Sequence, residues 1–129
     1  MSVDLICVAP DEVSKIWPYA GGMIRAAIER TDLGEFSELE KDVMAGDQLL
    51  WLAVSDHIEA AATTQLARGV CTLTACSGHQ RERWLSLFAK IEKYAKDEGC
   101  KAMRVVGRKG WERVLSGYHV EHVVLEKSL

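Results

Sequence analysis

Residues 70–83 read VCTLTACSGHQRER and change character halfway along. The first part, Val70–Cys76, is an apolar run that predicts a strand, and Ser77–Arg83 is a short polar loop. A helical stripe of apolar residues follows it: Trp84, Leu87, Phe88, Ile91, Tyr94 and Ala95. A polar loop between a strand and a helix N-terminus is a place where free backbone N–H groups can hold a phosphate. This stretch therefore predicts a strand, an anion-binding loop and a helix in succession.

The remaining segments extend this unit in both directions. Strands are predicted at Leu5–Val8, Gln48–Val54, Ile58–Ala67 and Ala102–Val106, with a last strand from Tyr118. A helical pair is predicted between the first two of these strands, and a short helix at Trp111–Leu115. Within the first helix of the pair, Pro18 and Gly21-Gly22 predict a kink or a division into two shorter helices. The resulting order, β-α-α-β-β-β-α-β-α-β, predicts an α/β domain.

Length and composition limit the class of protein. At 129 residues and 48% hydrophobic residues, the chain is expected to form one domain, 1–129, with a substantial core. No apolar run approaches the roughly 20 residues of a membrane span, and the N-terminus lacks the pattern of a signal peptide. We therefore expect no membrane association and a cytoplasmic location. The cysteines form no C-x-x-C pair, and the three-residue spacing of Cys76 and His79 has no second pair to complete a zinc site.

Charge is distributed unevenly along the chain. Residues 1–69 carry 5 Lys/Arg against 12 Asp/Glu, whereas residues 78–113 carry 10 against 5. A basic segment around the polar loop suits an anionic ligand such as a phosphorylated cofactor. The other interpretation is a solvated helix face that packs beside the acidic half. The net charge of −3 argues against a nucleic-acid partner.

The order and spacing of these elements resemble those of the GNAT acyltransferases. In that family a bulged fourth strand and the following loop bind the pyrophosphate of acetyl-CoA, and the thioester lies where the fourth and fifth strands diverge. The resemblance implies a mixed, mainly antiparallel sheet with helices on both faces. Val70–Cys76 would be the fourth strand and Ala102–Val106 the fifth. It also implies acetyl-CoA as cofactor, held by a set of residues at the loop: Cys76, Ser77, Gly78, His79, Arg81 and Arg83.

Two family motifs are altered in this chain. The family loop usually reads Gln/Arg-x-x-Gly-x-Gly/Ala, whereas residues 77–83 contain one glycine and place Glu82 beside the expected phosphates. The second motif follows the fifth strand and usually contains a tyrosine that protonates the departing thiolate. Val114 stands at that tyrosine's position, and Tyr118 is the nearest hydroxyl that could act as proton donor. The chain also leaves room for one terminal strand where the family usually has two. It resembles a short, degenerate member of the type that phages and prophages encode.

Two functions follow from this resemblance. The first is an acyl-CoA-dependent N-acyltransferase that moves an acetyl group to the amine of a small molecule or a protein. The second is a non-catalytic phage or prophage protein that keeps the scaffold for assembly or partner binding. The free sheet edge left by the missing strand also predicts pairing between chains, as in a homodimer. Cys76 could be a covalent acyl carrier, but a strand-end cysteine is more often a small buried residue.

Overall fold

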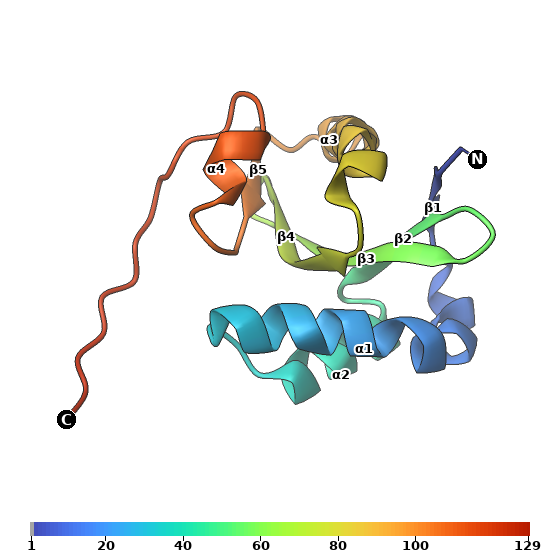
Figure 1. The fold of residues 1–129 in the computed structure, drawn as a ribbon, viewed down its shortest axis with the longest axis horizontal. Helices are drawn as coiled ribbons and strands as arrows, with labels where there is room; N and C mark the ends of the chain where they lie inside the picture. Colours follow the sequence, from blue (N-terminus) through green and yellow to red (C-terminus); the bar gives the residue numbers. More distant parts are fainter. Residues whose placement is uncertain (1) are drawn as a thin grey trace.

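The computed structural model describes residues 2–129, which form a five-stranded sheet with helices on both sides (Figure 1). The elements follow one another in this order: β1 (Asp4–Cys7), α1 (Val13–Thr31), α2 (Phe36–Ala45), β2 (Leu49–Val54), β3 (Ile58–Ala67), β4 (Val70–Gly78), α3 (Phe88–Asp97), β5 (Ala102–Val105) and α4 (Trp111–Val114). Short 3-10 turns precede α1 at Pro10–Glu12 and α3 at Arg81–Arg83 and Leu85–Leu87. The expected α/β class is confirmed.

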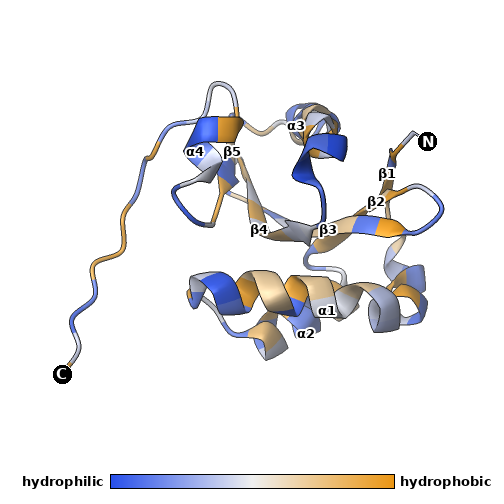
Figure 2. Cartoon of the chain, viewed as in Figure 1, coloured by the Kyte–Doolittle hydropathy of each residue, from blue (hydrophilic) through white to orange (hydrophobic). Residues whose placement is uncertain are grey.

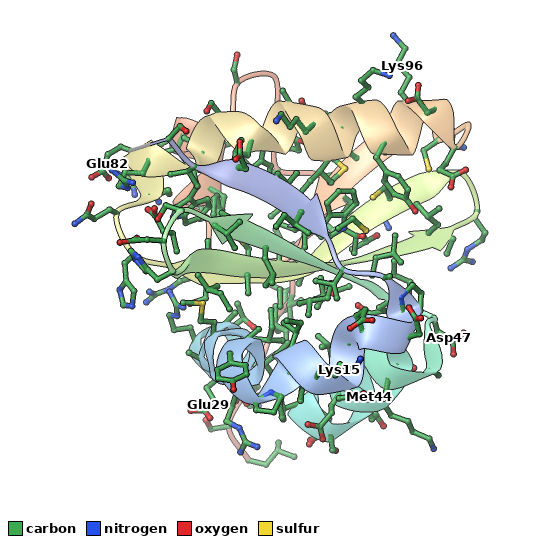
Figure 3. All side chains as sticks on the ribbon, turned by 90° about the vertical axis from the view of Figure 1, so that its right-hand side faces the viewer. Lys15, Glu29, Met44, Asp47, Glu82 and Lys96 are labelled. Carbon is green, nitrogen blue, oxygen red and sulfur yellow. The ribbon has the colours of Figure 1, made fainter. Side chains whose placement is uncertain are left out.

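The sheet separates two apolar cores. On one face, α1 and α2 bury residues such as Ile24 and Val43 against Leu50 and Leu52 of β2. On the other face, α3 buries Phe88 and Ile91 against a second set of sheet residues. Figure 3 shows the sheet between these layers, with the labelled Met44 on the α2 side and Lys96 pointing outward from α3. Burying both faces is what the largely apolar strands require.

The strands lie in the order β1-β2-β3-β4-β5, antiparallel up to β4, with β5 parallel to β4. This is the mixed, mainly antiparallel sheet expected from the sequence. Between β3 and β4 the register shifts, so that Thr63 faces Ala75 whereas Thr64 faces Leu73. Thr74 is therefore the extra residue of a β-bulge in β4. Because of this residue, Leu73 enters the core under α3, whereas Ala75 enters the core under α1.

Three expectations about local structure are wrong. The first helix is not divided in two: α1 runs without a break from Val13 to Thr31 with Pro18 inside it, and the alternative of a kink stays a prediction. Its buried face, which includes Trp17, Ala20 and Ile24, packs along the sheet, and this packing outweighs the one backbone bond that proline removes. The helix after the polar loop begins at Phe88, because residues 81–87 form 3-10 turns. No strand follows Tyr118, since residues 118–129 pair with no other strand in the described chain.

Within residues 2–129, none of the helices combines the length and the apolar character that crossing a membrane would need.

Candidate functional site

The candidate site lies where β4 and β5 separate. The two strands pair only from Val70 with Ala102 to Leu73 with Val105. Beyond Leu73, β4 continues through the bulge at Thr74 to Gly78, whereas β5 has ended. The second half of β4 therefore has β3 on one side and no strand on the other. This opening leaves the backbone and side chains of the second half of β4 accessible to a ligand between the two strands.

A solvent-open hollow of about 420 Å³ occupies this opening. Its walls come from the end of α1, the second half of β4, the segment after β5 and the start of α4. They consist of Ala27, Arg30, Thr31, Thr74, Ala75, Cys76, Val105, Val106, Gly107, Arg108 and Trp111. Two arginines and two threonines supply its polar groups, and the set includes no carboxylate and no histidine. Its charge therefore favours an anionic group in a ligand.

Polar contacts hold two walls of the hollow in place. The Arg30 guanidinium donates to Ser77 Oγ, which ties α1 to β4. Its Nε donates to the Ala26 carbonyl of the same helix at 3.3 Å. The bulged Thr74 hydroxyl donates to Gln48 Oε1 at 2.6 Å, and its oxygen lies 2.7 Å from Thr63 Oγ1. Gln48 and Thr63 are both buried, so these bonds satisfy polar groups that would otherwise destabilise the core. The bulge is thus anchored from inside the sheet.

Gly78 ends β4 at a position where no side chain fits. A Cβ atom built on it would lie 2.4 Å from the Glu59 carbonyl oxygen and 2.5 Å from the Ala60 Cβ on β3. The next residue continues this contact, since the His79 amide donates to the same Glu59 oxygen at 3.1 Å. The His79 carbonyl in turn accepts from Trp84 Nε1 at 2.9 Å. The single glycine of the loop therefore serves close packing against β3.

Arg83 forms a two-bond ion pair with Glu59. The Nε–Oε1 and Nη2–Oε2 distances are 2.5 and 2.9 Å, and the Glu59 side chain is only 4% exposed against 34% for Arg83. The hydrogen bonds from Arg83, with a weaker contribution from Ser55, lower the pKa of Glu59 to about 2. The buried carboxylate therefore stays ionised. Arg83, which was expected to contact a phosphate, thus connects the loop to β3.

Arg81 and Trp111 face each other across the opening. The Arg81 guanidinium carbon lies 5.7 Å from the centroid of the Trp111 ring, which is itself 5.7 Å from the Phe88 ring at the start of α3. The ring also lies directly over Gly107, where a Cβ would come within 2.9 Å of it. Trp111 therefore connects the chain after β5 to the loop after β4. Arg81 keeps an exposed, cationic position beside it.

Tyr118 lies outside the hollow. Its hydroxyl donates to Glu92 Oε2 of α3 at 2.6 Å, and it packs with the core on the α3 face. Burial, then the hydrogen bond to Glu92, raises the pKa of Tyr118 above its ordinary value, so its proton is held firmly. The Tyr118 hydroxyl therefore links the chain after α4 to α3.

The Cys76 thiol is a poor nucleophile in this environment. Burial raises its pKa to about 12, and the nearby charge of Arg30 only partly opposes that shift. At neutral pH the thiolate, which is the reactive form, is scarcely populated. Cys76 thus acts as a small, partly buried wall of the hollow, and a covalent acyl carrier at this position is disfavoured.

The structure gathers some of the expected site residues and separates others. Cys76, Ser77, Gly78, His79 and Arg81 are consecutive or nearly so at the opening, whereas the hydroxyl of Tyr118 is bound on α3. The sequence interpretation missed Arg30 and Thr31, because α1 is distant in sequence from β4. It missed Thr74 because the bulge depends on the pairing register of β3 and β4. A basic residue ending an amphipathic helix is too common a pattern to have identified Arg30.

Comparison with solved structures supports the fold. No protein-family model matches the sequence, and no curated protein matches it. An aminoglycoside acetyltransferase from an uncultured soil metagenomic sample, solved with sisomicin, matches with a TM-score of 0.71 at 12% identity, covering 98% of this chain and 95% of that chain. A GNAT family acetyltransferase of Staphylococcus aureus matches with a TM-score of 0.60 at 16% identity, covering 100% of both chains.

A third match is the aminoglycoside N-acetyltransferase AAC(6')-Iy in complex with CoA. Its TM-score is 0.65 at 15% identity, and the match covers 98% of this chain and 94% of that chain. These likenesses extend over nearly all of each protein. At such low identities they establish the fold and leave the activity open. The chain has the fold of the GNAT acetyltransferases.

Proposed function

We propose that this chain is an acyl-CoA-dependent N-acyltransferase that moves an acetyl group to an amine. The observation that carries the proposal is the opening between β4 and β5, with a bulge at Thr74 and a cationic hollow beside it. The fold supports it, since solved neighbours of similar length are N-acetyltransferases, one of them in complex with CoA. An acetyl-CoA cofactor and a cytoplasmic location are part of the proposal.

The residues present fit an anionic cofactor by charge. His79 and Arg81 are exposed at the loop after β4, beside the opening. The pair of Arg83 and Glu59 holds the loop against β3, while Cys76, Ser77 and Gly78 form the strand end from which it leaves. The cofactor would bring an activated thioester to this opening. The bulge would present the β4 backbone toward it, and water would accept the proton of the amine, since the hollow carries no base.

Titration with acetyl-CoA tests this assignment. We expect micromolar binding in a calorimeter, with CoA equivalent and ATP weak, and about tenfold weaker binding for Arg81→Ala because one charge-assisted contact is lost. Lys96→Ala is the matched control: it removes a positive charge from the far end of α3, where the side chain points outward (Figure 3). No heat and no thermal stabilisation at millimolar ligand would contradict the proposal.

The hollow also predicts which amines are accepted. Arg30 and Arg108 line it without any carboxylate, so a polycation such as an aminoglycoside is repelled. We expect turnover, followed by thiol release, with amines that carry a carboxylate and none with sisomicin. Arg108→Ala should raise the KM for the acidic amine about tenfold, through loss of one charged contact, while leaving kcat nearly unchanged. Efficient acetylation of sisomicin would overturn this specificity.

Internal contacts favour a second function, a non-catalytic scaffold that binds a partner. Arg83 is bonded to Glu59 and the Tyr118 hydroxyl to Glu92, so two groups that an active relative could direct at substrates hold this fold together instead. A phage or prophage protein that uses the scaffold for assembly would fit these contacts. The same calorimetric titration separates the two functions, because a pure scaffold should not distinguish CoA from ATP.

A further inference from the structure

The C-terminal segment of this chain leaves the folded body. Figure 1 shows it running from α4 away from β5 and ending beyond the level of α1. Residues 119–129 are all exposed and adopt neither helix nor strand. Its start is attached to the folded body: Tyr118 donates to Glu92, and the Val120 amide donates to Glu112 Oε2 at 3.3 Å. We define residues 121–129 as the arm.

The middle of the arm consists of consecutive apolar residues that are exposed to solvent. Val123, Val124 and Leu125 are 75, 69 and 92% exposed, and Figure 2 colours this part of the arm as hydrophobic. Consecutive exposed apolar residues favour burial by about 25 cal/mol for each Å² removed from water. Valine pairs also have high β-propensity. The arm thus has the composition of a strand that lacks a sheet.

The sheet has a free edge that would take such a strand. β5 pairs with β4 on one side, and no strand of the described residues pairs with its other side. At the end of the paired stretch, Leu73 lies opposite Val105, and the Val106 amide donates to the Leu73 oxygen at 3.1 Å. By the alternation of a strand, the amides of Ala102 and Arg104 also face β4, whereas the amides of Met103 and Val105 face outward. These outward groups need a partner or water.

We infer that the arm pairs with the β5 edge of a second copy of this chain, and that the second copy returns the same contact. The arm points away from its own β5, and its nine residues can reach about 30 Å at ~3.3 Å per residue, comparable with the diameter of a small domain. Reciprocal exchange closes a twofold dimer and leaves neither β5 edge open. Charge agrees: the arm carries two carboxylates, Glu121 and Glu126, against one lysine, Lys127, and the edge carries Lys101 and Arg104.

Native mass and light scattering of the full chain test this inference. We expect a dimer at micromolar concentration, and a monomer for Val123→Lys combined with Leu125→Lys, which place two charges in the pairing segment. Tyr19→Lys is the matched control, because it adds a charge at an exposed residue of α1 and should leave the dimer intact. A monomeric wild-type protein would overturn the proposed exchange. So would a dimer that persists in the double lysine variant.

A mixing experiment identifies the partner surfaces. Met103→Pro should block the edge without removing a β4 bond, because the Met103 amide faces outward, whereas Met103→Leu should remain dimeric. Each blocked variant alone should be monomeric. Mixing the arm variant with Met103→Pro restores one arm and one edge, and therefore should yield heterodimers. Circular dichroism confirms that each variant is folded, and an absence of heterodimers would show that arm and edge are not each other's partners.

Discussion

Replacing Gly78 with alanine is expected to destabilise the protein by about 3 kcal/mol or more. The new Cβ would lie 2.4 Å from the Glu59 carbonyl oxygen and 2.7 Å from the Ala60 Cα, and both are backbone atoms of a central strand. Because neither can swing aside, β3 and β4 must separate at the end from which the candidate loop leaves. Urea unfolding followed by circular dichroism measures this loss.

Gly22→Ala is the matched control for this substitution. Gly22 lies in the interior of α1, and nothing lies within 4 Å of the position its Cβ would take. Alanine there should stabilise the helix by about 1 kcal/mol, since glycine has the lower helix propensity. The same chemical change is thus expected to have opposite signs at two sites. A Gly78→Ala protein as stable as the wild type would mean that the close approach to β3 relaxes at little cost.

Arg83→Ala is expected to lower the melting temperature by more than about 5 °C at pH 7. It leaves the Glu59 carboxylate, 4% exposed, without its two-bond partner in the interior. Arg81→Ala is the natural comparison, since Arg81 lies two residues away in the same loop and its guanidinium lies beside the Trp111 ring rather than in an ion pair with Glu59. We expect Arg81→Ala to change the melting temperature little. Equal losses for both variants would contradict the distinction between a structural and a ligand-facing arginine.

The same ion pair predicts a dependence on pH. The folded pKa of Glu59, about 2, lies below its ordinary value of 4.5, because the ionised form receives the bonds from Arg83. The pair therefore contributes its full stability above about pH 4.5 and loses it progressively as the pH falls toward 2. Glu59→Gln should flatten this part of the stability curve. Melting temperatures of wild type and variant between pH 2 and pH 6 provide the test, and parallel curves would contradict it.

The sequence alone determined most of the architecture. The apolar runs and helical stripes predicted each of the five observed strands and the four helices in the correct order, because period-2 and period-3.6 patterns report which face of an element is buried. It also pointed to the loop of residues 77–83, which leaves the end of β4 next to the hollow. Its one false element was a strand from Tyr118, where apolar residues are present but no neighbouring strand is available within the chain.

Tertiary structure decided what the residues of the loop do. Arg81 and Arg83 look equivalent in sequence, but only Arg83 meets Glu59, which β3 brings alongside from 24 positions earlier. The bulge at Thr74 and the arrival of Arg30 at the hollow likewise depend on register and packing between distant segments. Local patterns record the periodicity of burial, whereas the partner of a charged side chain is set by which strands and helices lie together in the folded chain.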